Sequence, residues 1–276
     1  MENIEEILRW YLLSGVNEFC DEKPLNALVQ AKADVLDNVS NASKNTVTSK
    51  PIIATYYQLS DKPQRPATTL LAQNNSGACN NAREVCAAAK TLTELKAVME
   101  KFEGCSLKFS ANSTVFGHGS PQAKLMLIGE APGADEDMEG VPFVGRSGQL
   151  LTKMLAAIGI DREECYITNV LPWRPPGNRT PTDGEIAVCL PFLQRQIELI
   201  KPKCIFLLGG SAANAVLNNA ESISHLRGHI IDYITSDGTA IPTLSSFHPA
   251  YLLRTPQQKA KAWSDLLRLH RNLNEG

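Results

Sequence analysis

Residues 124–158 read KLMLIGEAPGADEDMEGVPFVGRSGQLLTKMLAAI, and this stretch decides the predicted fold. It begins with a short apolar run that ends at Gly129, which is typical of a buried strand. A glycine-rich loop follows, and residues 147–158 then carry apolar side chains at helical spacing until Gly159, a suitable helix stop. The order of strand, loop and helix predicts one unit of an α/β protein.

Three further apolar runs, at 165–170, 204–208 and 242–246, are each followed by a loop and a helical pattern. After the first of these, Thr182 and Glu185 have capping-box spacing for a helix that reaches Ile200. After the last, a loop at 247–255 precedes a final helix that reaches about Leu273. We therefore predict a mainly parallel sheet of four strands with helices on both faces. In such sheets, ligands bind beyond the carboxyl ends of the strands.

The chain divides into three predicted regions. Residues 1–18 have apolar side chains at helical spacing and predict an N-terminal amphipathic helix. Residues 19–78 are rich in Asn, Ser, Thr, Ala and Lys, contain four prolines and predict a flexible, low-complexity linker. Residues 79–276 form the predicted catalytic domain, which opens with a helix at about 82–102.

Composition sets broad limits on the class of protein. The chain has 276 residues, 43% of them hydrophobic, so it can bury a sizeable core. The net charge of −2 gives no global support for a polyanionic partner, so any contact with nucleic acid must come from local groups. The seven scattered cysteines indicate reduced thiols, and no apolar run is long enough to span a bilayer. We expect a cytoplasmic monomer.

The loop after the first strand contains four carboxylates, Glu130, Asp135, Glu136 and Asp137. They indicate either a chemical site or a solvated acidic loop. The glycines of this loop allow close approach to a flat ligand or a phosphate. Neither a dinucleotide-binding fingerprint nor a Walker lysine is present, which excludes the two commonest phosphate-binding loops at this position.

Two later loops carry further candidate residues. Asn169, at the end of the second strand, presents the amide donor and acceptor that complement a uracil or adenine edge, although a lone Asn often caps a turn. Beside Trp173, Arg174 and Arg179 can contact phosphates or stack on a base, or simply lie at the surface. His248, just past the fourth strand, can stabilise a developing oxyanion or serve a structural role.

The segment that follows His248 suggests a contact with DNA. Leu252, Leu253 and Arg254 can supply an apolar wedge and a phosphate contact, as enzymes that extrude a base require. Core packing is the alternative for both leucines.

Taken together in this order, the motifs resemble those of family 4 uracil-DNA glycosylases. They are Gly-Glu-Ala-Pro-Gly (129–133), Pro-Phe-Val-Gly (142–145), Gly-Gln-Leu-Leu (148–151), Tyr-Ile-Thr-Asn (166–169), Arg-Pro-Pro (174–176), Asn-Arg (178–179) and His-Pro-Ala-Tyr-Leu-Leu-Arg (248–254). The resemblance covers about residues 92–273. It implies a three-layer α/β/α sandwich and hydrolysis of the N-glycosidic bond of uracil in DNA, as in base excision repair.

The resemblance also implies roles for individual residues. Phe143 would stack on an extruded uracil, Asn169 would read its pairing edge and His248 would hydrogen-bond the uracil oxygen that gains charge. Backbone amides near Glu130 and Ala131 would favour the leaving group. Either Glu130 or Glu136 would orient water or face the cationic sugar, and the sequence does not divide these roles. Asn178 matches a second amide of the active loops.

The chain departs from the family pattern at the iron–sulfur cluster. Most members hold a four-iron, four-sulfur cluster with four cysteines, whereas here Cys105 and Cys189 stand at two of those positions, with Lys108 and Trp173 at the others. An ammonium and an indole do not replace thiolates as cluster ligands. We expect no cofactor to be required for the chemistry, and the ligand pattern argues against a bound cluster.

Two other function classes remain open from the sequence. A non-catalytic protein could bind uracil-containing or abasic DNA and associate with a repair polymerase or another repair protein through the N-terminal helix or linker. A nucleotide hydrolase could instead use the acidic loop to bind magnesium. The presence of Phe143, Asn169 and His248 together favours the enzyme, because a binder needs no leaving-group histidine. An enzyme acting on DNA would also be expected at the nucleoid.

Overall fold

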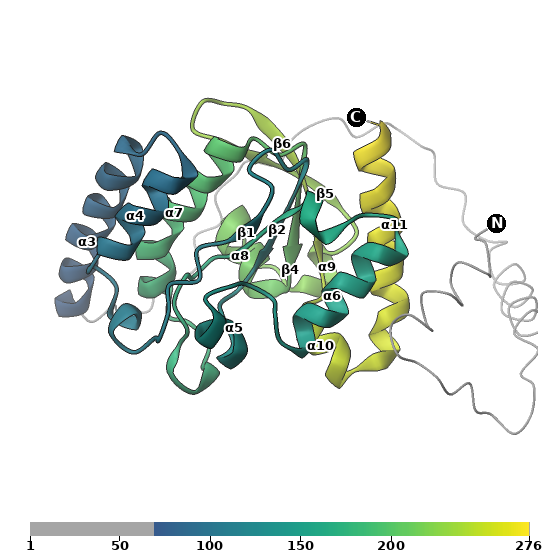
Figure 1. Ribbon diagram of the computed structural model, residues 1–276, viewed down its shortest axis with the longest axis horizontal. Helices are drawn as coiled ribbons and strands as arrows, with labels where there is room; N and C mark the ends of the chain where they lie inside the picture. Colours follow the sequence, from purple (N-terminus) through teal and green to yellow (C-terminus); the bar gives the residue numbers. More distant parts are fainter. Residues whose placement is uncertain (1–68, 276) are drawn as a thin grey trace, which may run out of the picture. The chain divides into compact units, whose positions relative to one another are not determined.

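The computed structural model describes residues 69–275, so the predicted N-terminal helix and most of the predicted linker lie outside the described residues. The described chain alternates strands with helices (Figure 1). The strands are β1 (His118–Gly119), β2 (Leu125–Gly129), β3 (Tyr166–Asn169), β4 (Cys204–Leu208), β5 (Ile230–Ile234) and β6 (Ala240–Ser246). The α-helices are α3 (Thr69–Ala88), α4 (Leu92–Lys101), α5 (Ala134–Glu139), α6 (Arg146–Ala157), α7 (Asp183–Ile200), α8 (Gly210–Leu217), α9 (Ile223–Leu226), α10 (Pro249–Arg254) and α11 (Lys259–Glu275).

The sheet has the strand order β1-β3-β2-β4-β6-β5. The four central strands are parallel, which confirms the predicted parallel sheet, whereas β1 and β5 are antiparallel edge strands that were not predicted. The register pairs Gly129 with Asn169 and Leu208 with Ser246. Because the carboxyl ends of these strands align, the loops that follow them meet at one edge of the sheet.

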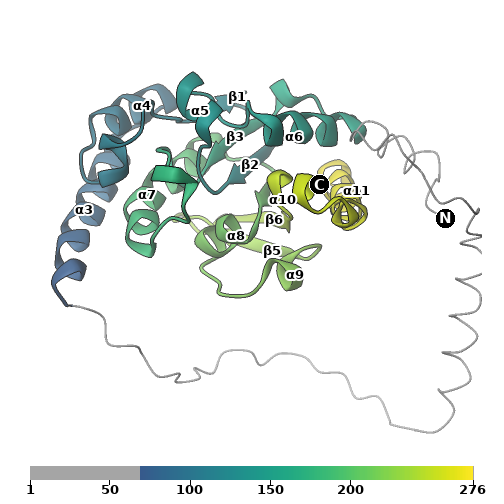
Figure 2. The ribbon, with the colours of Figure 1, turned by 90° about the horizontal axis from the view of Figure 1, so that it is seen from below.

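Helices cover both faces of the sheet and complete the predicted three-layer sandwich (Figures 1 and 2). Along β2, Met126 and Ile128 join the core beneath α3, α4, α7 and α8. Leu125 and Leu127 point to the opposite face and join the core beneath α6, α10 and α11. All four side chains are buried, because a central strand of this kind is covered on both sides.

The helix boundaries confirm some predictions and correct others. The Thr182 hydroxyl accepts a hydrogen bond from the Glu185 backbone N–H, and the Glu185 carboxylate accepts one from Thr182 N–H, so the predicted capping box opens α7. The predicted single helix at 82–102 is wrong. The structure has two helices, α3 and α4, because Thr91 caps a new N-terminus by accepting from Glu94 N–H. Helix α3 begins at Thr69, inside the range predicted as linker.

The predicted loop at 247–255 contains the helix α10. His248 is its N-cap residue and Pro249 occupies its first turn, where a proline costs no hydrogen bond. This cap fixes the histidine at the end of β6. No helix within residues 69–275 is both long and apolar enough to cross a membrane.

Candidate active site

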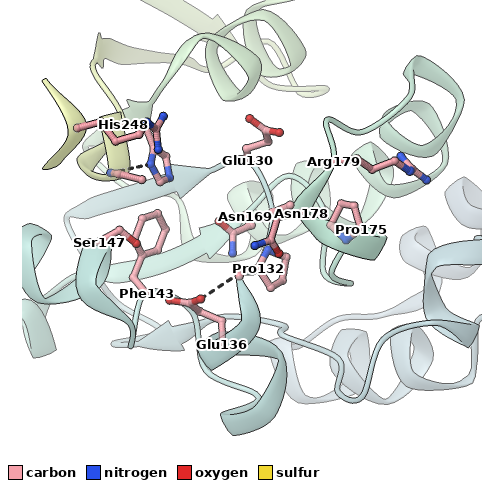
Figure 3. A pocket seen from close by; sticks show the side chains of 14 residues that line it. Glu130, Pro132, Glu136, Phe143, Ser147, Asn169, Pro175, Asn178, Arg179 and His248 are labelled. Carbon is pink, nitrogen blue, oxygen red and sulfur yellow. Dashed lines mark hydrogen bonds between the residues drawn. The ribbon is translucent and has the colours of Figure 1, made fainter. Parts of the chain in front are cut away.

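A cavity of about 370 Å³ lies where the loops after β2, β3 and β6 meet (Figure 3). Its position at the carboxyl edge of the parallel strands is the one expected for an α/β sheet. The lining residues are Glu130, Ala131, Pro132, Gly133, Glu136, Phe143, Ser147, Asn169, Pro175, Asn178, Arg179, His248, Ala250 and Arg254.

Most of the residues predicted from the sequence line this cavity. Those brought together are Glu130, Ala131, Glu136, Phe143, Asn169, Asn178, Arg179, His248 and Arg254, whereas Arg174 and Leu253 do not line it. Sequence reasoning missed Pro132, Gly133, Ser147, Pro175 and Ala250. Pro132, Gly133, Pro175 and Ala250 belong to the quoted motifs, which were the signal that could have identified them. Ser147, in the first turn of α6, lies between two of those motifs.

Asn169 presents an unsatisfied acceptor inside the cavity. Its side chain is 5% exposed, and its Oδ1 atom is buried without a hydrogen-bond partner. Gly129, on the paired strand, leaves room for this amide, because a Cβ there would lie 2.4 Å from Asn169 Oδ1 and 2.6 Å from Phe143 Cζ. A buried acceptor without a partner is costly unless a ligand supplies the donor. The site is therefore suited to a ligand with an N–H at this point.

Phe143 adopts a left-handed backbone conformation, with φ of 56°. Such a conformation is strained for a bulky side chain and is held by its surroundings. Helix α6 packs closely against it, since a Cβ at Gly148 would lie 1.7 Å from the Phe143 carbonyl oxygen. The buried ring is thereby fixed beside the cavity, 5.6 Å between centroids from the stacked ring of His248.

The environment of His248 favours one neutral tautomer. Ala250 N–H donates to His248 Nδ1 over 3.1 Å, which requires an unprotonated Nδ1 and leaves the proton of the neutral ring on Nε2. Desolvation in the pocket, with a smaller contribution from the positive charge of Arg254, lowers the pKa of His248 to about 4. At neutral pH the residue is therefore an uncharged hydrogen-bond donor through Nε2.

The two candidate carboxylates have different surroundings. Glu136 accepts three backbone hydrogen bonds, from Gly133, Val144 and Gly145, at 3.0 Å each. It thus ties the start of α5 to the loop that carries Phe143. Within residues 69–275, no hydrogen-bond or ion-pair partner contacts the Glu130 carboxylate, which also lines the cavity and is drawn between His248 and Arg179 in Figure 3. Of the two, Glu130 has the carboxylate available to a ligand.

The basic residues of the rim differ in the partners they have within the protein. Arg179 forms a bidentate pair with Glu185, at 2.9 and 2.6 Å, and this pair lowers the pKa of Glu185 to about 2. Arg174 Nε donates to Asn178 Oδ1 over 2.7 Å. No carboxylate of the described chain pairs with Arg254. An incoming anion can therefore bind the Arg254 guanidinium without first breaking an ion pair.

The predicted leucine wedge is only partly available. Leu252 is fully buried in the core, whereas Leu253 is 37% exposed. Core packing therefore accounts for Leu252, and only Leu253 can reach a partner outside the protein.

The residues at the four cluster positions implied by the resemblance do not fit an iron–sulfur cluster. The Cys189 thiol donates to Cys105 Sγ over 3.9 Å, which lowers the pKa of Cys105 and raises that of Cys189. Lys108 Nζ donates to the Glu100 carbonyl oxygen over 2.6 Å, and the buried Trp173 donates through Nε1 to Thr114 Oγ1 over 3.0 Å. Two thiols, an ammonium and an indole do not make a four-thiolate set.

Within residues 69–275, the other cysteines do not complete this set. Cys79 and Cys86 lie on α3, and no three His, Cys, Asp or Glu side chains among the described residues are grouped so that they could hold a metal ion.

Comparison with known proteins agrees with the geometry of the cavity. The family model of the uracil DNA glycosylase superfamily matches residues 116–267. The type-4 uracil-DNA glycosylase of Archaeoglobus fulgidus is 41% identical over 169 residues, which cover 60% of this chain and 84% of the relative. That of Thermotoga maritima is 44% identical over 157 residues, covering 56% and 80%. A DNA polymerase of Bacillus phage SP01 is 30% identical over 142 residues, covering 51% of this chain and 15% of the polymerase. The chain belongs to the type-4 uracil-DNA glycosylases of the uracil DNA glycosylase superfamily.

Proposed function

We propose that the protein hydrolyses the N-glycosidic bond of deoxyuridine in DNA, releasing uracil and leaving an abasic site for base excision repair. The observation that carries this function is the buried, unpaired Oδ1 atom of Asn169, in a cavity that also holds Phe143 and His248. Family membership supports the same reaction, and the cavity supports the assignment of roles to individual residues.

The Asn169 amide distinguishes uracil from cytosine. Uracil offers an N–H at N3 and a carbonyl oxygen at C4, which match the Oδ1 acceptor and the Nδ2 donor of an asparagine. Cytosine reverses both groups, so each of its polar atoms would face a group of the same kind. The Phe143 ring, which lines the cavity, would stack on the base, an interaction that any pyrimidine can make. Recognition of uracil therefore depends on the amide, and the ring contributes affinity.

We infer that His248 and Glu130 act on the two charges that develop as the bond breaks. The electron pair of the glycosidic bond moves to uracil N1, and negative charge spreads onto the uracil oxygens. Neutral His248 can donate through Nε2 to one of these oxygens without giving up its proton. Glu130 can face the cationic sugar and accept a proton from the water that attacks it. Glu136, with its carboxylate occupied by backbone donors, supports the loop that carries Phe143.

We also propose that the enzyme works without an iron–sulfur cluster. The Trp173 indole fills a buried position at the start of the loop that carries Arg174 and Asn178, and its bond to Thr114 ties that loop to the segment before β1. Lys108 in turn holds the C-terminal end of α4 through the Glu100 carbonyl oxygen. The bond between Trp173 and Thr114 joins the same two parts of the chain that a shared cluster would join.

Two further expectations concern the setting of the enzyme. The similarity to part of a phage DNA polymerase supports an association with a repair polymerase or another repair protein, which we propose for residues 1–67. Deletion of residues 1–67 would then abolish co-purification with such a partner while leaving uracil release intact. A cytoplasmic, nucleoid-associated location stays a prediction from the sequence.

The test of the function is a labelled oligonucleotide that contains one uracil, incubated with the full chain in the presence of a chelator and then treated with alkali. Strand cleavage at the uracil position, and none in matched oligonucleotides with cytosine or thymine, is the expected result. Asn169→Asp should lower the single-turnover rate by about 100-fold or more, because it replaces the donor to O4 by an acceptor. Retarded mobility without cleavage would instead indicate a non-catalytic binding protein.

A further inference from the structure

A buried polar network surrounds Ser246, the last residue of β6, which lies two residues before His248. Ser246 Oγ donates to Asp265 Oδ2 over 2.6 Å, and both residues are almost fully buried, at 0% and 1% exposed. Asp265 lies on α11, so this bond fixes the last residue of the strand to a helix on the outer layer. None of the network residues lines the cavity, so they have no direct contact with a ligand there.

Arg227 completes the network from the other side. Its guanidinium donates to both oxygens of Asp265, over 3.1 and 2.7 Å, and to the carbonyl oxygen of Lys261. The same guanidinium lies over the ring of Phe247, 5.4 Å from its centroid. A buried carboxylate with a bidentate arginine partner and a hydroxyl donor is satisfied only in one arrangement of its partners.

The backbone at the end of β6 is held as well. Gly209 N–H donates to the Ser246 carbonyl oxygen over 2.8 Å, and Gly228 N–H donates to the Ser245 carbonyl oxygen over 3.3 Å. Gly209 also approaches His248 closely, since a Cβ there would lie 3.1 Å from His248 Cβ. The chain entering His248 is therefore fixed through the Ser246 side chain, the Ser246 carbonyl and the Phe247 ring.

We propose that Ser246, Asp265 and Arg227 are positioning residues that hold His248 where its Nε2 proton meets the departing uracil. A catalytic hydrogen bond loses much of its value when its donor moves by a fraction of an ångström, so the benefit of this network appears in the transition state. The inference rests on the proposed function, because it assigns the network a role in that reaction.

The test uses Ser246→Ala, which removes one hydroxyl and leaves the Asp265–Arg227 ion pair in place. We expect the single-turnover rate of uracil release to fall by about tenfold, the effect of one hydrogen bond, with unchanged affinity for uracil-containing DNA. The matched control is Ser245→Ala. Ser245 is equally buried on the same strand but points to the opposite face of the sheet, and its loss should leave the rate within about twofold.

A double-mutant cycle separates positioning from general stability. In a His248→Ala background, Ser246→Ala should cause no further loss of rate, because the group that it positions is gone. Asp265→Asn, which keeps the shape of the side chain, should show the same dependence on His248. Equal fold-losses in the two backgrounds, or a Ser245→Ala effect as large as that of Ser246→Ala, would overturn the inference. A wild-type chain that releases no uracil would instead overturn the proposed function.

Discussion

The rings of Phe143 and His248 lie 5.6 Å apart between centroids, with their planes 30° from parallel. A planar base held between two rings needs about 7 Å, because each stacked contact takes about 3.5 Å. The base therefore does not enter between them. In the proposed reaction, Phe143 would offer its face to the base while His248 approaches an edge through Nε2, the arrangement that a leaving-group donor requires.

Glu130 and Glu136 are expected to respond differently to the same substitution. Glu130→Gln removes a carboxylate that lines the cavity and should lower the single-turnover rate by about 100-fold or more, with an unchanged melting temperature. Glu136→Gln leaves one carbonyl oxygen for three backbone donors and should destabilise the fold by about 1–3 kcal/mol. Thermal unfolding and single-turnover assays of both variants show which glutamate acts in the reaction and which supports the fold. A stable, inactive Glu136→Gln with an active Glu130→Gln would reverse the assignment.

The pH dependence of the reaction should show no histidine titration near neutrality. Because the folded pKa of His248 is lowered to about 4, the ring stays neutral as pH rises from about 5.5 to 8. The single-turnover rate should therefore not fall as the pH passes through about 6.5, the usual pKa of histidine. A rate that declines with rising pH in this window, and loses that decline in His248→Ala, would mean that His248 acts as a cation.

Gly129 should be intolerant of any side chain. In Gly129→Ala, the new Cβ would lie 2.4 Å from Asn169 Oδ1 and 2.6 Å from Phe143 Cζ, so both recognition groups must move. We expect uracil release to fall by about 100-fold or more, since displaced groups lose their transition-state contacts. The matched control is Gly77→Ala, where a Cβ meets no atom within 4 Å. Near-normal rates for Gly129→Ala would show that the amide and the ring are not the recognition groups.

The central strands and their convergent loops were predictable from the sequence, because the hydrophobic pattern of each strand matches its buried position in the sheet. The run that forms β2 is apolar at every position, as a strand covered on both faces requires, and parallel strands bring their carboxyl ends to one edge. The edge strands were harder to predict from the sequence. β1 has only two residues, and β5 alternates between exposed and partly buried side chains at the rim of the sheet.

Most residues that line the cavity were predictable from the sequence, whereas the hydrogen bonds among them were not. Asn169 and His248 follow strands, so their convergence follows from topology. The role of Glu136 could not be predicted, because two of its three donors are backbone N–H groups of Val144 and Gly145, in a loop whose path depends on α6. The helix α10 was missed for a related reason, since a six-residue helix that contains Pro249 forms only with the cap that His248 supplies.

The residues at the cluster positions lead to a prediction about metal content. Anaerobically purified protein should contain far less than one iron atom per chain and show no visible absorption, because Lys108 and Trp173 supply no thiolate.

Trp173→Cys should lower the free energy of unfolding by about 3–5 kcal/mol, since it empties a buried site that the indole fills. Thr114→Val, which removes only the partner of the indole N–H, should cost about 1 kcal/mol and serves as the comparison. Iron analysis and thermal unfolding check both statements, and about four iron atoms per chain in the wild-type protein would show that other side chains complete the cluster.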